Sequence, residues 1–166
     1  MPRAEPIQPT SARRLCWLGA LLLLACGLAR AQPPLAEAVD LQQLAGEIRA
    51  RGVPLVLVVW ARDCVYCRVL DHEILRPLLA SGDLDGRAIL RKLDLDGAGV
   101  RDFDGQPVDG WSFAGRYQAR LTPTVLFLDA AGNELTERLV GISNVDFYPA
   151  YLERAIDAAG TRLRAR

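Results

Sequence analysis

The chain has 166 residues, 51% of them hydrophobic, and its 20 basic and 20 acidic residues give a formal net charge of zero. This length suits one ordinary domain, and the apolar content excludes a chain that is disordered throughout. The balanced charge argues against a dedicated nucleic-acid-binding protein, which carries a basic surplus.

The N-terminal segment has the anatomy of an export signal. Arg13 and Arg14 precede an uncharged run over 15–28, and a small-x-small sequence ends at Ala31. A basic region, an apolar region and a small-residue cleavage site are typical of a secretory signal peptide, and the run is shorter than the roughly 20 residues that span a bilayer. We expect cleavage after Ala31 and a periplasmic or otherwise exported protein. The alternatives are lipidation at Cys26 and an uncleaved anchor.

Hydrophobic periodicity and turn residues predict an alternation of helices and strands after the signal. In chain order we first expect a helix over 40–51 that Gly52 ends, a buried strand over 55–60, and a helix from Cys64 that Pro77 kinks or splits. A strand over 88–95, a loop or surface insertion over 96–110 and a short helix over 112–118 follow. The chain then forms a hairpin of strands over 124–128 and 134–140 and a final helix capped by Ser143 or Asn144. Strands joined by helices favour parallel pairing, and a short turn favours antiparallel pairing. The pattern therefore predicts an α/β fold with a mixed sheet covered on both faces.

We divide the chain into four parts on this basis. They are a signal peptide (1–31), a linker (32–39), one domain (40–160) and a C-terminal tail (161–166) that we expect to be frayed.

Two cysteines, Cys64 and Cys67, lie where the strand over 55–60 leads into a helix. The first turn of a helix offers unpaired N–H groups and a partial positive charge, which stabilise a thiolate. Cys64 is then the exposed nucleophile, and Cys67, one turn later, attacks the mixed disulfide and releases the substrate. This chemistry needs no cofactor, because the two sulfurs carry the electron pair themselves.

Other uses of the two thiols fit less well. A permanent disulfide over so small a loop removes little entropy from the unfolded chain. Structural zinc needs four ligands, whereas the chain after Ala31 offers two thiols and one histidine, His72. A c-type haem needs histidine directly after the second cysteine, where Arg68 stands. We predict no metal site. A Cu(I) metallochaperone stays open as an alternative, since Cu(I) favours soft sulfur ligands.

The segment over 55–67, with Trp60-Ala61 ahead of the cysteines, resembles the active-site segment of the thioredoxin-like superfamily. Leu121-Thr122-Pro123-Thr124 before a strand resembles the cis-proline loop of that family. The likeness extends over roughly 53–159 and is strongest to the exported bacterial proteins that include SoxW-type thioredoxins. It implies a thioredoxin-like fold, a three-layer α/β/α arrangement whose central mixed sheet ends in an antiparallel hairpin.

The resemblance also implies roles for individual residues. Cys64 is the attacking thiolate and Cys67 the resolving thiol, and the Thr122–Pro123 bond is cis and faces them. The implied substrate-binding residues are Thr122, Pro123, Tyr66 and Trp60, with Trp60 packed beneath the active site.

One departure from the family concerns the proton acceptor for Cys67. The buried acid often found six residues before the first cysteine is Val58 here. Water or Glu47 is our suggested replacement.

The aspartates at the end of the strand over 88–95 and after it have a simpler interpretation. Asp94, Asp96, Asp102, Asp104 and Asp109 do not have the spacing of a twelve-residue calcium loop, so we expect a solvated acidic loop.

The sequence predicts a monomeric periplasmic thiol–disulfide oxidoreductase that exchanges disulfides with protein substrates. We expect it to act as a reductase and to receive electrons from a membrane-bound donor. A disulfide oxidase or isomerase is the alternative, because Tyr66 and Thr122 also resemble residues of those proteins.

Overall fold

The computed structural model describes residues 34–166, so the predicted signal peptide and the start of the linker lie outside the described residues. Its centre is a four-stranded sheet of order β2-β1-β5-β6. The strands are β1 (Leu55–Trp60), β2 (Ile89–Asp94), β5 (Thr124–Leu128) and β6 (Leu139–Val140), with a separate hairpin of β3 (Val100–Arg101) and β4 (Pro107–Val108). The helical elements are α2 (Leu41–Arg51), α3 (Val65–Val69), the π-helical η1 (Leu70–Leu75), α4 (Arg76–Ser81), α5 (Gly110–Arg116) and α6 (Tyr148–Arg164).

The sheet is mixed, as predicted. Strand β1 pairs in parallel with β2 and antiparallel with β5, and β6 adds antiparallel to β5. In the β1–β5 register Val59 lies opposite Thr124. The carboxyl end of β1 therefore lies beside the amino end of β5. The segment that follows β1 and the segment that precedes β5 are brought together at this end of the sheet.

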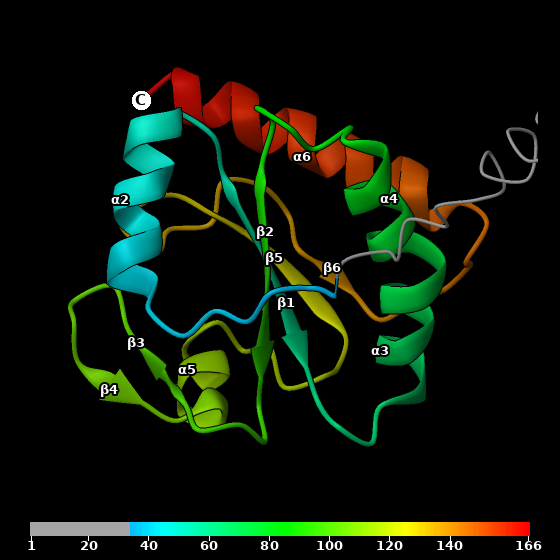
Figure 1. Ribbon diagram of the computed structural model, residues 1–166, viewed down its shortest axis with the longest axis horizontal. Helices are drawn as coiled ribbons and strands as arrows, with labels where there is room; N and C mark the ends of the chain where they lie inside the picture. Colours follow the sequence, from blue (N-terminus) through cyan, green and yellow to red (C-terminus); the bar gives the residue numbers. More distant parts are fainter. Residues whose placement is uncertain (1–33) are drawn as a thin grey trace, which may run out of the picture. The chain divides into compact units, whose positions relative to one another are not determined.

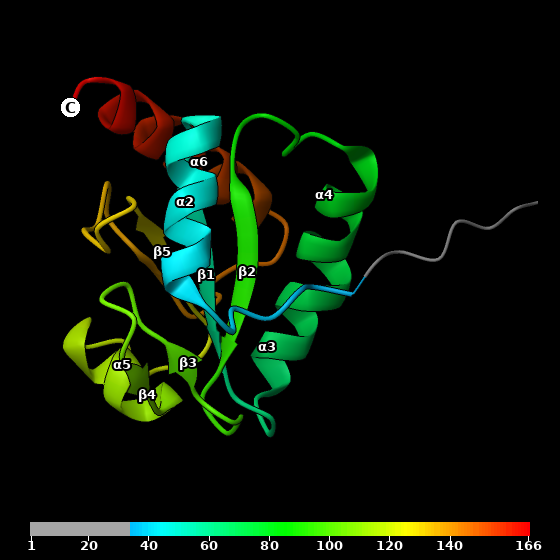
Figure 2. The same ribbon diagram turned by 60° about the vertical axis from the view of Figure 1, so that its left-hand side comes forward.

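The side chains of β1 alternate between two apolar cores. Leu55, Leu57 and Val59 pack with residues of α2 and α5, whereas Val56 and Val58 pack with residues of η1 and α6. All five are fully buried, which explains why the strand is apolar at every position. Figures 1 and 2 show α2 on one side of the sheet and α3 and α4 on the other. The arrangement is the predicted three-layer α/β/α fold.

Helix α2 begins and ends where the sequence predicts. The side chain of Asp40 accepts a hydrogen bond of 2.8 Å from the backbone N–H of Gln43, which satisfies a free donor of the first turn. Gly52 follows the helix with a left-handed φ of 63°, and its N–H donates to the carbonyl of Ile48. A side chain is disfavoured at this φ, so glycine ends the helix at little cost.

The helix that follows Cys64 is split, as Pro77 leads us to expect. Elements α3, η1 and α4 form one helical run from Val65 to Ser81, in which η1 is wider than an α-helix. Pro77 lies in the first turn of α4 and has no N–H, so it cannot donate a backbone hydrogen bond within this run. The N–H of Arg76 reaches back five residues to the carbonyl of Asp71.

The N-terminal boundary of the domain differs from our prediction. Residues 36–38 are not a linker but pair with the outer edge of β2. The N–H of Ala38 donates to the carbonyl of Lys92 at 2.7 Å, and the N–H of Lys92 donates to Ala36 at 2.9 Å. Leu35 and Ala38 are buried. These backbone bonds cover an edge that is otherwise open.

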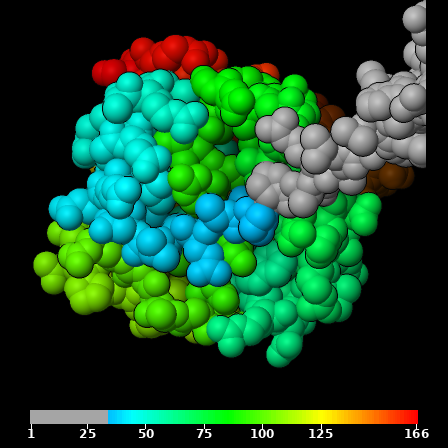
Figure 3. Space-filling model, viewed as in Figure 1, coloured from blue at the N-terminus to red at the C-terminus, as the bar shows by residue number. Residues whose placement is uncertain are grey.

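The predicted loop over 96–110 contains the β3–β4 hairpin, which the sequence did not indicate. The N–H of Arg101 donates to the carbonyl of Val39 at 3.0 Å, and the guanidinium of Arg101 lies 3.3 Å from the Asp40 carboxylate. The hairpin has only two residues in each strand, so its contacts with the residues just before α2 stabilise it. Figure 3 shows the yellow-green surface of this region at the lower left, against the blue and cyan surface around α2.

Three further expectations near the C-terminus differ from the structure. The strand over 134–140 is reduced to β6, because the chain leaves β5 after the Leu135 N–H has bonded to the Phe127 carbonyl and returns only at Leu139. The tail from 161 is not frayed, since α6 continues to Arg164. Asn144 does not cap α6 itself; its side chain accepts from the N–H of Asp146 in the preceding turn. Within residues 34–166 no helix is long and apolar enough to cross a membrane.

Candidate active site

Cys64 and Cys67 form a disulfide at the carboxyl end of β1, with their Cα atoms 5.2 Å apart. Cys64 occupies the N-cap position of α3, in extended backbone geometry. Its Sγ accepts a hydrogen bond of 3.0 Å from the backbone N–H of Cys67. The first cysteine thus occupies the place that serine or aspartate often takes at a helix start, where N–H groups and the helix dipole favour a negative charge.

The two cysteines differ in their access to solvent. Cys67 is 0% exposed, whereas Cys64 is partly exposed. A substrate sulfur can therefore reach Cys64 but not Cys67. The division between an attacking and a resolving thiol stays a prediction, and it requires this kind of asymmetry, because only the outer sulfur would meet the substrate and the inner one would meet the outer.

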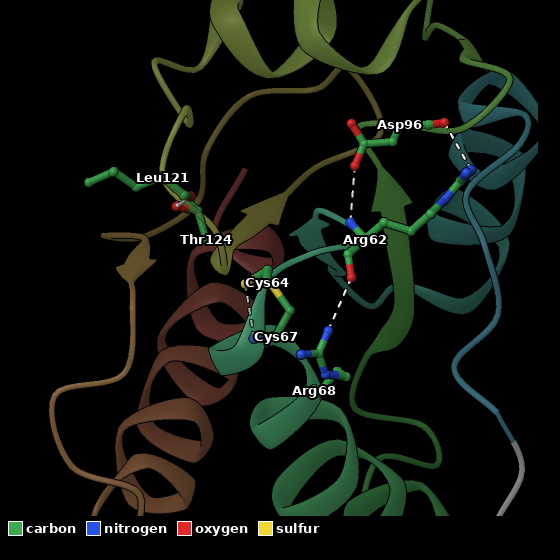
Figure 4. Close-up of a disulfide and its surroundings, with 7 residues drawn as sticks. All are labelled: Arg62, Cys64, Cys67, Arg68, Asp96, Leu121 and Thr124. Carbon is green, nitrogen blue, oxygen red and sulfur yellow. Dashed lines mark hydrogen bonds between the residues drawn. A yellow bond between two sulfur atoms is a disulfide. The ribbon is translucent and has the colours of Figure 1, made fainter.

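The loop before β5 lies at the same end of the sheet as the disulfide. Its Thr122–Pro123 peptide bond is cis, as the family resemblance implied. The Pro123 carbonyl accepts a bond of 2.8 Å from the N–H of Gly141, and the Thr124 hydroxyl donates to the Leu121 carbonyl at 2.7 Å. Figure 4 shows Leu121 and Thr124, which flank the cis bond, in the surroundings of the disulfide. Pro123 is buried and Thr122 is partly exposed.

Aromatic and aliphatic side chains are exposed around the cysteines. Tyr66 and Val65, between them, are each 61% exposed, and Leu121 of the cis-proline loop is 68% exposed. Trp60 ends β1 and is half-buried, with the Lys92 ammonium 5.4 Å from its ring centroid. The predicted residues Tyr66, Thr122 and Pro123 thus come together near the disulfide, and Trp60 lies at the strand end that leads to it.

Our suggestion that Glu47 takes up the proton of Cys67 is wrong. Glu47 lies on α2, with its carboxylate 3.7 Å from the Arg91 guanidinium, and α2 packs on the opposite face of the sheet from the helix that carries Cys67. The buried carboxylate on that helix is instead Asp71, 6% exposed and four residues after Cys67. In the sequence, the signal for Asp71 is a charged residue between the apolar residues Leu70 and Ile74 of this helix.

The segment just before Cys64 carries contacts that the sequence did not reveal. The backbone N–H of Arg62 donates to Asp96 Oδ2 at 3.0 Å, and the Arg62 guanidinium donates to the Asp96 carbonyl at 3.0 Å. Arg68 Nη1 donates to the Arg62 carbonyl at 3.2 Å. All three bonds are drawn in Figure 4. Asp96 therefore has a partner in the active-site segment. The expectation of a solvated acidic loop is wrong for Asp102, which is 5% exposed and paired with Arg116, and for Asp94, whose side chain is 14% exposed.

No group of three or more histidine, cysteine or acidic side chains is placed to hold a metal ion within residues 34–166. The disulfide can exchange electrons with another disulfide without a cofactor, because its two sulfurs carry the electron pair themselves.

Comparison with known proteins agrees with this geometry. A family model for a thioredoxin-like domain matches residues 41–156. No curated protein sequence gives a significant match. Among solved structures, a DsbH oxidoreductase is 12% identical with a TM-score of 0.55, and the match covers 80% of this chain and 92% of that one. This likeness supports the fold alone.

Thioredoxins are also among the similar structures. The thioredoxin of Fasciola hepatica is 20% identical with a TM-score of 0.49, and the match covers 74% of this chain and 97% of that one. A mutant thioredoxin from Halobacterium salinarum is 21% identical with a TM-score of 0.48, and the match covers 78% of this chain and 96% of that one.

Proposed function

The chain belongs to the thioredoxin-like family and is a thiol–disulfide oxidoreductase, and from this premise we propose that it reduces protein disulfides outside the cytoplasm. The observation that carries the proposal is the arrangement of the two cysteines. Cys64 is accessible at the start of a helix, and Cys67 is fully buried behind it. One sulfur can engage a substrate while the other is reserved for releasing it.

The reaction begins from the reduced dithiol. The Cys64 thiolate attacks one sulfur of a substrate disulfide, so that a mixed disulfide forms and the other substrate sulfur leaves as a thiolate and takes up a proton. Cys67 then loses its proton and attacks Cys64 Sγ. The Cys64–Cys67 bond forms, the mixed disulfide breaks, and the second substrate sulfur leaves as a thiolate that is protonated in turn. Two electrons have passed to the substrate, whose two thiolates take up one proton equivalent from Cys67 and one from the solvent, which received the proton of Cys64 when the thiolate formed.

The exposed apolar side chains suit a protein substrate. Tyr66, Val65 and Leu121 are more than half exposed close to the disulfide, and aromatic side chains are enriched where proteins bind one another. Thr122 and Pro123, in the neighbouring loop, are the residues we propose to contact the substrate backbone beside its disulfide.

The negative charge of Asp63 beside Cys64 supports the proposed direction of electron flow. Asp63 is exposed and directly precedes Cys64, so its carboxylate opposes a negative charge on that sulfur. Strong oxidants of this chemistry are those whose reduced form is stabilised. A thiolate that is stabilised less leaves the disulfide form more favoured, and this supports a reductase over an oxidase or isomerase.

A reductase must itself be reduced after each turnover. We propose that a dithiol donor held in the membrane reduces the Cys64–Cys67 disulfide by the same two exchange steps, and that the protein acts as a monomer. The basic, apolar and small-residue pattern that ends at Ala31 supports export to the compartment where such a donor acts.

Reduction of insulin disulfides by the pre-reduced protein tests the proposed activity. Wild-type protein should precipitate the insulin B chain with dithiothreitol as the final reductant, Cys64→Ser should be inactive, and Cys67→Ser should accumulate a mixed disulfide. Full activity of Cys64→Ser would refute the mechanism. Reshuffling of a scrambled substrate without net reduction would favour an isomerase, and stoichiometric Cu(I) binding without disulfide exchange would favour a metallochaperone.

Export is tested separately by fusing residues 1–40 to alkaline phosphatase, which is active only outside the bacterial cytoplasm. The fusion should be active, and a fusion that lacks 15–28 should be inactive. The mass of the exported protein then separates cleavage after Ala31 from lipidation at Cys26. An inactive fusion would contradict the proposed location and leave the dithiol chemistry unaffected.

A further inference from the structure

Side-chain hydrogen bonds continue the β1–β2 pairing beyond the ends of both strands. The last backbone rung is the bond of 2.8 Å from the Leu95 N–H to the Trp60 carbonyl. Two residues after Trp60, the N–H of Arg62 donates to the carboxylate of Asp96, in the loop that follows β2, at 3.0 Å. The Arg62 guanidinium returns a bond of 3.0 Å to the Asp96 carbonyl, so the two residues hold each other reciprocally.

Asp96 is itself held in place. Its N–H donates to Asp94 Oδ1 at 3.0 Å, and the Arg62 Nε lies 3.7 Å from Asp94 Oδ2. The Asp94 side chain is 14% exposed, so this support comes from a largely buried carboxylate at the end of β2. The acceptor for the Arg62 N–H is therefore fixed by the sheet.

The carbonyl of Arg62 is held from the other side. Arg68, which directly follows Cys67 on α3, donates from Nη1 to that carbonyl at 3.2 Å. Both polar groups of the Arg62 backbone are thus bonded two residues before Cys64, as Figure 4 shows. We call Arg62, Arg68, Asp94 and Asp96 the Arg62 clamp.

The clamp bears on the position of the Cys64 sulfur. The N–H of Cys64 donates to the carbonyl of Ala61 at 3.3 Å, so Arg62 lies within the single tight turn that ends at Cys64. When the disulfide is reduced, the S–S bond no longer keeps Cys64 at the helix start. We propose that Asp96 is a positioning residue that keeps the reduced Cys64 sulfur where the Cys67 N–H donates to it. The inference rests on the proposed redox role of the two cysteines.

The hydrogen bond and the charge of Asp96 have opposite effects on Cys64. The clamp contributes two guanidinium groups and two carboxylates to the segment around Cys64, and Asp63 directly precedes that cysteine. Removing the negative charge of Asp96 favours a thiolate, whereas removing its hydrogen bond frees Cys64 from the helix start and disfavours one. Asp96→Asn removes the charge and keeps an acceptor oxygen, and Asp96→Ala removes both. The two variants have the same charge, so a difference between them reports the hydrogen bond alone.

The pH profile of Cys64 alkylation measures the thiolate directly. The reduced full-length protein is pulsed with iodoacetamide at a series of pH values, and the modified Cys64 peptide is quantified by mass spectrometry. We expect the Asp96→Ala profile to lie at higher pH than that of Asp96→Asn, with about threefold less thiolate at any pH below both midpoints. Coincident profiles, or a profile for Asp96→Ala at lower pH, would overturn the proposal.

Two controls keep a structural effect and the proposed function apart. Asp85→Ala removes an exposed carboxylate near the opposite end of β2 and should leave the profile unchanged. Thermal unfolding shows whether the Asp96 variants are merely less stable; lowered midpoints with coincident profiles would refute the positioning role. Wild-type insulin reduction is measured in parallel. Its absence would refute the proposed function, whereas its presence with coincident profiles would refute only the clamp.

Discussion

Asp71 and Arg76 allow a direct test of how the helix that carries Cys67 is stabilised. Asp71 Oδ2 accepts from Arg76 Nε at 2.9 Å and lies 2.7 Å from Nη2, whereas Asp71 Oδ1 is buried without a hydrogen-bond partner among the described residues. Arg76→Met removes both bonds and leaves a carboxylate that is 8% exposed without its cation.

The expected loss follows from the exposure of each partner. Removing one member of a buried ion pair costs about 3–5 kcal/mol, and a charge-assisted hydrogen bond contributes about 1.5–3 kcal/mol. The Arg76 side chain is 29% exposed, so water replaces part of what it supplies. We therefore expect Arg76→Met to lower the free energy of unfolding by about 2 kcal/mol. Asp71→Leu removes the buried charge altogether and should cost less than about 1 kcal/mol.

Urea unfolding followed by circular dichroism, extrapolated linearly to water, gives both values. In the Asp71→Leu background the further change Arg76→Met should be nearly neutral, because no carboxylate remains to lose its partner. A loss below about 0.5 kcal/mol for Arg76→Met alone, or a larger loss for Asp71→Leu than for Arg76→Met, would refute the reasoning.

Three further predictions concern the region around β4 and β5. Burial, reinforced by the charge of nearby Asp102, raises the pKa of Tyr117 to about 12, so stability should fall between about pH 10 and 12, and Tyr117→Phe should lose that dependence in alkaline unfolding. Burial opposes the charged form of Asp129, but hydrogen bonds from Asn133 outweigh it and lower the pKa. The stabilisation of the fold by the Asp129 carboxylate should therefore be present above about pH 4 and be lost below it. The urea midpoints of the wild type and Asp129→Ala should converge at low pH, and a difference that stays constant with pH would contradict this. Gly99 has a φ of 89° and its added Cβ would lie 2.6 Å from a backbone oxygen, so Gly99→Ala should lower the thermal midpoint by several degrees in a scan.

The parts of the fold predicted from the sequence are those determined by local chemistry. The strand before Cys64 is an unbroken apolar run because both of its faces are covered. Asp40 and Gly52 mark the ends of α2 because capping depends on residues within one turn. Cys64 and Cys67 stand out because their spacing and their place after a strand are visible without any tertiary contact.

The features that the sequence did not reveal depend on distant partners. Residues 36–38 have no strand pattern of their own and are ordered by bonds to Lys92. The β3–β4 hairpin is too short to be recognised and relies on the start of α2. The bond between Arg62 and Asp96 joins residues 34 positions apart. The sequence holds many arginines and aspartates, so nothing in it predicts that these two form a pair. The family model supports the fold and the chemistry. The individual substrate contacts stay predictions for all four residues: Thr122, Pro123, Tyr66 and Trp60.

The reduction potential of the Cys64–Cys67 pair tests the central claim most directly. The purified protein is equilibrated in dithiothreitol or glutathione buffers, and the fraction of reduced dithiol is measured by acid quenching and thiol labelling. A reductase should have a potential near the value of about −270 mV that is typical of thioredoxin. A potential at or above about −180 mV would mean an oxidase or isomerase and would contradict the proposed direction.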